Sequence, residues 1–209
     1  MKLDAEGFEI EDGVDLHYQV LKELGDCCAT LGRHDEAWRC YQQAADLAPD
    51  QPGPLVGIGV VALQQGRLDS AAAAFDDARR LNPSCAEAYG GLAMVCQQRQ
   101  DFAGAFDFYL RCLQFNSDNL IALLGLFQAS CQMGTFGKII HYLEQYLDRH
   151  PGDTSVLFCL ASLYAREGLL TQAQDALITV LALEPDKPDA QKLLDDVNHR
   201  LGEQPLASH

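Results

Sequence analysis

Apolar residues recur along this chain at the spacing of amphipathic helices, and the predicted helices come in pairs. Between Ala29 and Pro49 the sequence reads ATLGRHDEAWRCYQQAADLAP. Gly32 ends one predicted helix, a short polar turn follows, and a second helix ends before Pro49. Helices that alternate with short turns in this way predict an all-α protein.

The same pattern returns after 34 residues. Five residues of the first copy have an equivalent 34 positions later. Gly66, Ala71, Phe75, Ala78 and Pro83 stand where the first copy has Gly32, Ala37, Tyr41, Ala44 and Pro49. A fixed period of this length is typical of repeat proteins built from one helix pair per repeat. The period predicts five repeats, at about 18–51, 52–85, 86–119, 120–153 and 154–187.

We predict one domain over residues 14–201. In the first repeat, Asp35 is the expected N-cap of the second helix. A last helix at about 186–201 has one apolar stripe and would cover the exposed end of the stack, as terminal caps do. Residues 202–209 are expected to fray, and residues 1–13 to form an acidic flexible arm, which is favoured over an arm that docks through Phe8 and Ile10.

The fourth repeat departs from the others. Phe127 and Ile139 stand at two repeat positions, or columns, that hold small residues in the first three repeats. The first column holds Gly25, Gly59 and Ala93, and the second holds Ala37, Ala71 and Ala105. Large side chains at a close helix contact must separate the helices or be repacked. We therefore expect a wider helix pair and a local change in superhelical twist there.

Composition narrows the classes of partner. The chain has 209 residues, 48% of them hydrophobic, and a formal net charge of −15. Such acidity argues against nucleic acid and against an anionic membrane surface as binding partners. No apolar run is long enough to span a membrane, and the N-terminus lacks the apolar stretch of a signal peptide. A cytoplasmic protein is expected, with its eight cysteines as free thiols in the core or groove.

The chain resembles a tetratricopeptide-repeat (TPR) protein from about residue 14 to 201. Its five repeats agree in their period, in the positions that hold small residues and in the turn that breaks the helix. The third copy departs slightly, with Gln100 in place of the turn glycine and Ser117 in place of the closing proline. The resemblance implies a right-handed α-solenoid whose first helices line a concave groove, and a groove that binds a peptide or helix of a partner protein.

The resemblance also implies which side chains face that groove. The main candidates are Val56, Val60, Leu63, Met94, Gln97, Ile121, Leu124, Gln128, Phe158, Ser162 and Arg166. The wider set adds Gln19, Lys22, Asp26, Gln64, Glu87, Gly90 and Gln132. Apolar side chains with a few amides suit an amphipathic helix or an extended apolar segment. The cationic clamp by which some TPR proteins hold chaperone tails is missing, since Asp26 stands where an Asn is needed.

One glycine column leaves two interpretations open. Gly57, Gly91 and Gly125 recur at one position of three first helices, although glycine destabilises a helix by about 0.5–1 kcal/mol relative to alanine. Either a partner approaches the backbone closely, or the helices pack tightly against each other within the solenoid.

No catalytic or cofactor constellation is predicted. Cys27, Cys28, His34 and Cys40 lack the spacing of a zinc site, and no metal is expected. The favoured function is a non-enzymatic protein-interaction scaffold. The alternatives are a self-assembling structural protein, which would be a homo-oligomer, or a substrate-recruiting or regulatory subunit of an enzyme, such as a glycosyltransferase or a secretion or pilus assembly system.

Overall fold

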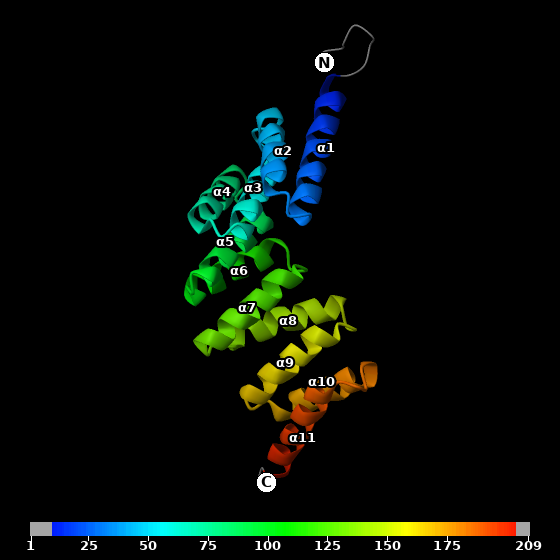
Figure 1. Ribbon diagram of the computed structural model, residues 1–209. Helices are drawn as coiled ribbons and strands as arrows, with labels where there is room; N and C mark the ends of the chain where they lie inside the picture. The colour runs from blue at the N-terminus through cyan, green and yellow to red at the C-terminus, as the bar shows by residue number, and fades with distance from the viewer. Residues whose placement is uncertain (1–9, 204–209) are drawn as a thin grey trace. The chain divides into compact units, whose positions relative to one another are not determined.

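The computed structural model describes residues 10–203, which form helices joined by short connections, with no strand in that range (Figure 1). The helices are α1 (Ile10–Thr30), α2 (His34–Leu47), α3 (Gly53–Gln64), α4 (Leu68–Leu81), α5 (Ala86–Gln98), α6 (Phe102–Phe115), α7 (Leu120–Met133), α8 (Gly137–Arg149), α9 (Thr154–Arg166), α10 (Leu170–Leu183) and α11 (Pro188–Glu203). The prediction of an all-α fold of paired helices is confirmed.

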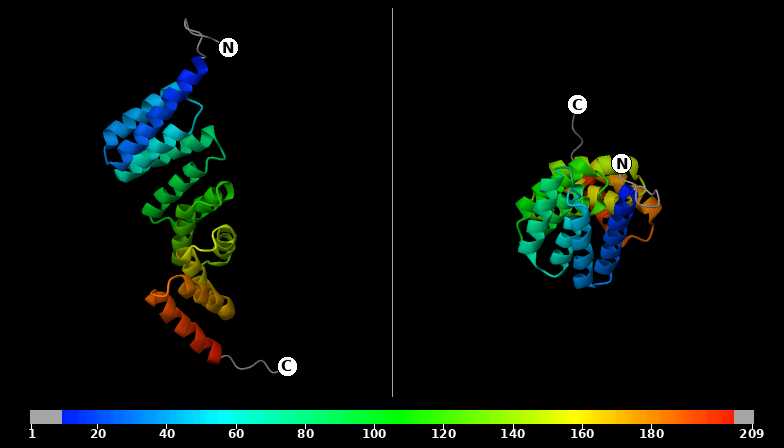
Figure 2. Two further views of the ribbon diagram at one scale, coloured as in Figure 1. Left: turned by 90° about the vertical axis from the view of Figure 1, so that its right-hand side faces the viewer. Right: turned by 90° about the horizontal axis from the view of Figure 1, so that it is seen from above.

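The chain divides into two compact units, the N-terminal unit of residues 1–116 and the C-terminal unit of residues 117–209. The N-terminal unit stacks the pairs α1–α2, α3–α4 and α5–α6, and the C-terminal unit holds α7–α8, α9–α10 and α11 (Figure 2). Each unit is a segment of α-solenoid. That the five repeats form one continuous domain stays a proposal.

Aromatic rings wedged between glycines hold the N-terminal unit together. A Cβ added at Gly25 or Gly57 would lie under 3.0 Å from the Tyr41 ring, and one added at Gly59 or Gly91 would meet the Phe75 ring equally closely. Both rings are almost fully buried. At Gly57 and Gly91 the structure therefore supports tight packing within the solenoid, because an aromatic ring of the same unit already occupies the space beside the backbone.

Helix starts depend on the backbone as much as on residue preference. The prediction of Asp35 as an N-cap is wrong, because α2 begins at His34 and Arg33 is its N-cap residue. The backbone N–H groups of Glu36 and Ala37 donate to the Arg33 carbonyl. Asp35 lies in the first turn, where its charge interacts favourably with the helix dipole.

The α7–α8 pair of the C-terminal unit is more open than the others. Ile139 is fully buried and Phe127 is half-buried. The two helices approach each other closely at far fewer positions than α9 and α10 do. The wider pair is confirmed, and the change in twist stays a prediction.

The helix at the end of the C-terminal unit covers its neighbours with one face. Ala190 and Val197 of α11 are fully buried, and Lys192, Asp195 and Asp196 are exposed. The helix begins at Pro188, a residue suited to a first helical turn, and continues to Glu203. Gly202 is therefore helical, contrary to the predicted frayed end, and residues 10–13 of the predicted arm belong to α1.

The rest of the predicted arm and tail, residues 1–9 and 204–209, lies outside the described residues. Across residues 10–203, no helix combines the length and the apolar character needed to cross a membrane.

Candidate functional site

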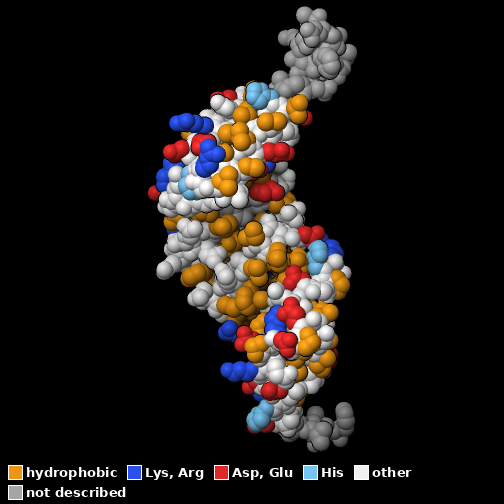
Figure 3. Space-filling model, turned by 45° about the vertical axis from the view of Figure 1, so that its right-hand side comes forward, with side chains coloured by type: hydrophobic (Ala, Val, Ile, Leu, Met, Phe, Trp, Pro, Cys, Tyr) orange, Lys and Arg blue, Asp and Glu red, His pale blue; other side chains and the backbone are white. Residues whose placement is uncertain are grey.

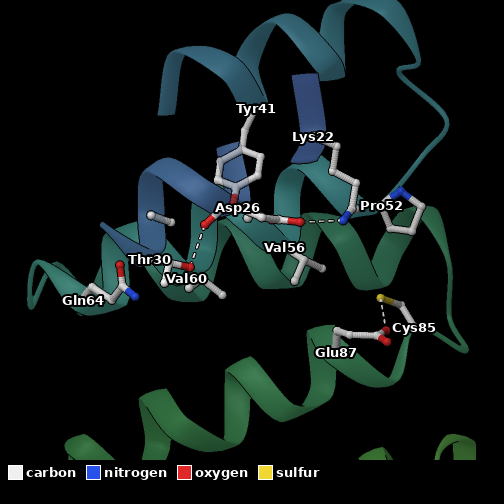
Figure 4. A pocket seen from close by; sticks show the side chains of 13 residues that line it. Lys22, Asp26, Thr30, Tyr41, Pro52, Val56, Val60, Gln64, Cys85 and Glu87 are labelled. Carbon is white, nitrogen blue, oxygen red and sulfur yellow. Dashed lines mark hydrogen bonds and ion pairs between the residues drawn. The ribbon is translucent and has the colours of Figure 1, made fainter. Parts of the chain in front are cut away.

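A pocket of about 470 Å³ opens in the N-terminal unit (Figure 4). Side chains from α1, α2, α3 and the start of α5 line it together with the connection before α3. The lining residues are Lys22, Asp26, Ala29, Thr30, Tyr41, Pro52, Gly53, Val56, Gly57, Val60, Gln64, Cys85 and Glu87. Because most of them stand on first helices, the pocket lies on the surface where the repeat pattern predicts a groove.

The apolar part of this pocket comes from α3. Val56 and Val60 are four residues apart, so they project from the same face of the helix, and Figure 4 shows both side chains on one side of it. Val56 is half-buried and Val60 is 36% exposed. Together they offer a small apolar surface that solvent reaches.

The polar wall is a hydrogen-bonded chain centred on the Asp26 carboxylate. Lys22 Nζ lies 2.9 Å from Asp26 Oδ2, and the Tyr41 hydroxyl donates to Asp26 Oδ1 at 2.7 Å (Figure 4). The hydrogen bond to Asp26 raises the pKa of Lys22. Burial, and then the hydrogen bond to Asp26, raises the pKa of Tyr41. Both groups are protonated at neutral pH, so the donors that fix Asp26 are in place before any ligand arrives.

Glu87 of α5 supplies the opposite side. Its Oε2 accepts a hydrogen bond from Cys85 Sγ at 3.5 Å, and burial raises the pKa of the Cys85 thiol. Among residues 10–203 no cation forms an ion pair with Glu87. Since the one lysine of the pocket is paired with Asp26, the pocket carries net negative charge.

The predicted groove residues of the N-terminal unit have different environments. Val56 and Val60 line the pocket. Leu63 does not, since it is 7% exposed and packs in a core cluster with Phe75 and Val95, so its assignment to the groove is wrong.

Two further predicted residues of this unit lie on α5, outside the pocket. Met94 is 38% exposed. Gln97 Oε1 accepts a hydrogen bond from the Tyr109 hydroxyl at 2.7 Å, and burial raises the pKa of Tyr109 to about 12. Gln97 thus has an internal role as a hydrogen-bond acceptor, in addition to any contact it makes with a partner.

In the C-terminal unit, the predicted residues of α7 are accessible. Ile121 is 68% exposed, Leu124 is 37% exposed, and Gln128 is exposed. These three side chains therefore stay candidates for contact with a partner.

The predicted residues of α9 are engaged within the C-terminal unit. Lys187 Nζ lies 5.7 Å from the centre of the Phe158 ring, and the Ser162 hydroxyl donates to the Phe158 carbonyl at 2.8 Å. The Arg166 guanidinium lies 4.4 Å from the centre of the Phe136 ring. Arg166 is nevertheless exposed, whereas Phe158 and Ser162 are half-buried and offer a partner only their remaining surface.

The pocket also contains residues that were not among those assigned to the groove from the sequence. Tyr41 belongs to a second helix, but its ring passes between Gly25 and Gly57, and its hydroxyl reaches Asp26. The paired glycines around an aromatic position were the signal that could have revealed it. Pro52 and Cys85 lie just before first helices, where no groove column was assigned.

The thiols and acids of the described chain form no cluster suited to a metal ion. No three His, Cys, Asp or Glu side chains within residues 10–203 are grouped to hold a metal ion. Cys28, Cys85 and Cys112 are buried, and burial raises the pKa of Cys112 to about 11. The Cys85 and Cys112 thiols are therefore protonated at neutral pH and are poor nucleophiles.

Comparison with known proteins points to one repeat family. Profiles described as tetratricopeptide repeat match residues 20–55, 56–119 and 132–196. The chain is 24% identical over 180 residues to the TPR repeat-containing protein YpiA of Bacillus subtilis, across 84% of this chain and 40% of that protein. It is 25% identical over 188 residues to cellulose synthase operon protein C of Pseudomonas fluorescens, across 84% of this chain and 14% of that protein. The chain spans less than half the length of these curated relatives.

Solved structures share the fold at low sequence identity. The structure of Pseudomonas aeruginosa pilF matches with a TM-score of 0.70 at 15% identity, covering 94% of this chain and 95% of that one. A MamA protein matches at 0.61 and 20% identity, covering 92% and 98%. YrrB, described as a TPR protein with an unusual peptide-binding site, matches at 0.62 and 16% identity, covering 82% and 89%. At these identities the likeness concerns the fold alone.

Proposed function

Because the chain belongs to the tetratricopeptide-repeat family, we propose that it is a non-catalytic scaffold that binds a segment of a partner protein in the pocket of the N-terminal unit. The observation that carries this proposal is the pocket itself: about 470 Å³, with an apolar α3 face between a pre-ordered Asp26 wall and Glu87. Pockets that bind small molecules have about 300–1,000 Å³, so this pocket has room for a side-chain anchor.

The chemistry of the lining defines the kind of segment. Val56 and Val60 suit an apolar anchor, as in an amphipathic helix or an extended apolar peptide. Glu87, which has no ion pair within residues 10–203, suits a Lys or Arg next to that anchor. The net charge of −15 favours the approach of such a basic segment.

The first test changes the apolar face. Val60→Glu places a carboxylate on the apolar side of the pocket and should abolish capture of the partner by the immobilised protein. Leu81→Glu is the matched control, because Leu81 is 44% exposed, ends α4 and does not line the pocket. Far-UV circular dichroism checks that both variants keep native helicity. Equal capture by native protein and Val60→Glu would contradict the proposal.

The second test locates the contact directly. A photo-reactive residue at position 60 should form a covalent product with the partner captured in the first test, and one at position 81 should not. Mass spectrometry of the product then gives the partner segment, which should contain apolar residues beside a Lys or Arg. Cross-linking at position 81 alone would place the partner elsewhere and refute this site.

A further inference from the structure

An exposed apolar stripe runs along α1. Leu16, Val20, Leu24 and Leu31 are 66%, 53%, 49% and 71% exposed, and Cys27 is exposed as well. At 100° per residue these five side chains fall within an arc of about 80°. Figure 3 shows apolar side chains among charged ones at this end of the described chain. No described residue covers the stripe, although apolar surface of this kind usually marks a contact.

The repeat period indicates which kind of contact the residues of the stripe make in the other repeats. Val20, Leu24 and Cys27 correspond, 34 residues later, to Pro54, Ile58 and Val61, and after a further period to Ala88, Leu92 and Val95. All six later residues are buried except Ile58, which is half-buried. These columns therefore form the contact between a first helix and the repeat before it.

The contact of α3 with the first repeat illustrates the interface. Val61 is fully buried in a cluster with Cys28, Ala37 and Tyr41, and Ile58 packs against the same cluster. The middle of the α1 stripe repeats the docking face of α3, and no helix pair within residues 10–203 covers it.

The end of the C-terminal unit has the opposite character. The outer face of α11 exposes Lys192, Asp195 and Asp196. A polar outer face is what a solenoid end needs to stay free of contacts. Head-to-tail stacking of copies would press the α1 stripe against these charged groups, whereas pairing of two α1 stripes buries apolar surface on both sides.

We propose that the α1 stripe is a self-association surface on which a second copy of this chain docks through its own α1, antiparallel and about a two-fold axis. The spacing of the stripe supports this pairing, since positions 16, 20, 24, 27 and 31 are nearly symmetric about a point between residues 23 and 24. Antiparallel pairing sets Leu16 opposite Leu31 of the second copy and Val20 opposite Cys27, with Leu24 near the axis. A two-fold interface of this kind is closed and gives a dimer.

The oligomeric state tests the surface. Sedimentation velocity over a range of concentrations should show a reversible dimer for the full chain. Leu24→Glu buries a charge at the axis and should raise the dimer dissociation constant by at least about tenfold. Ile178→Glu is the matched control, since Ile178 of α10 is 52% exposed outside the stripe. A native chain that stays monomeric, or equal dissociation constants for native protein and Leu24→Glu, would overturn the proposal.

A disulfide trap tests the register. In Val20→Cys the new thiol should face Cys27 of the second copy, and mild oxidation should link the dimer covalently. Val20→Cys combined with Cys27→Ser should not cross-link, because two copies of one position then lie several residues apart along the helices. Cross-linking of the double variant, or none in Val20→Cys, would refute the antiparallel register.

Deletion of residues 1–9 distinguishes a second copy of the chain from these residues as the occupant of the stripe. Those residues could themselves cover the stripe. The deletion should leave the dimer dissociation constant of the native chain unchanged. A native monomer that dimerises only after the deletion would overturn the proposal and identify residues 1–9 as the occupant.

Discussion

The helix pairs of the N-terminal unit and the α7–α8 pair of the C-terminal unit fill equivalent columns with side chains of opposite size. In the N-terminal unit, Gly59 leaves room for the Phe75 ring from the partner helix of the pair. In α7 and α8, Phe127 and Ile139 occupy the two columns that are small in the first three repeats. The first arrangement brings backbones close together, and the second keeps them apart.

The difference teaches that side-chain volume in two columns sets the separation of a pair. Where one column holds glycine, a ring from the other helix reaches the backbone and fills the space. Where both columns hold large side chains, the helices cannot close without overlap, and closing them would cost about 1–3 kcal/mol. The substitutions below each alter one of these volumes or, in the last case, the turn within a pair.

Removal of a wedged ring should have the largest effect. Phe75 is fully buried between Gly59 and Gly91, and glycines have no side chains that could move into the space. Phe75→Ala should lower the free energy of unfolding of the N-terminal unit by about 4 kcal/mol. Urea unfolding followed by the fluorescence of Trp38, the only tryptophan, reports on this unit.

Phe115→Ala is the control for this measurement. Phe115 is 46% exposed at the end of α6, so its removal leaves no closed cavity and should lower the unfolding free energy by about 1 kcal/mol or less. If both substitutions gave the same loss, the wedged ring would have no special role.

The open pair should also be sensitive to loss of volume. Ile139 is fully buried, and Ile139→Ala should destabilise the C-terminal unit by about 3 kcal/mol if the helices stay apart around the cavity. Hydrogen exchange of the α8 amides measures this loss in the full chain. A loss below about 1 kcal/mol would mean that α7 and α8 close onto each other, so that the two pairs differ less than their side chains suggest.

Two adjacent glycines of α5 provide a smaller and more selective test. A Cβ at Gly91 would lie under 3.0 Å from the Phe75 ring, whereas one at Gly90 would lie 3.5 Å from Cys112 Sγ, an ordinary contact. Gly91→Ala should destabilise the N-terminal unit by about 2 kcal/mol. Gly90→Ala should stabilise it by up to about 1 kcal/mol, because alanine is the better helix former.

The same Trp38 unfolding measurement applies to both variants. Since the substitution and the helix are the same, their difference isolates the contact with the ring. Stabilisation by Gly91→Ala would show that the Phe75 ring moves aside freely.

Much of the fold followed from the period, because a repeat fixes helix order and most helix ends together. The second helix of the first pair, predicted to end before Pro49, ends at Leu47 in the structure. Of the pocket, the groove columns anticipated Lys22, Asp26, Val56, Val60, Gln64 and Glu87. These residues share one face of their helices, and a face is a property that spacing along the sequence determines.

The errors have physical causes that spacing does not contain. Leu63 shares a predicted face, but it packs into a core cluster with residues of neighbouring helices. Tyr41 crosses from the second helix because two glycines leave a passage for its ring. Asp35 is a residue type that favours the N-cap, yet backbone hydrogen bonds to the Arg33 carbonyl start the helix two residues earlier. Each error depends on a tertiary or backbone contact.

The smallest expected effect concerns the turn inside the third repeat. Gln100 has a φ of 62° at the position where Gly32, Gly66, Gly134 and Gly168 also have positive φ. A side chain disfavours this left-handed conformation, and glycine does not. Gln100→Gly should therefore stabilise the N-terminal unit by about 0.5–1 kcal/mol, after allowing for the greater freedom of glycine in the unfolded chain.

The reverse exchange at the equivalent turn makes this prediction decisive. Gly66→Gln should destabilise the same unit by about 1 kcal/mol, and a Cβ at Gly66 meets no atom within 4 Å, so no clash contributes. Because the two variants exchange the same residues, unfolded-chain effects largely cancel when Gly66→Gln and Gln100→Gly are combined. A combined variant as stable as the native protein would show that both turns carry the same backbone strain, and a neutral Gln100→Gly would show that the third turn tolerates its side chain without strain.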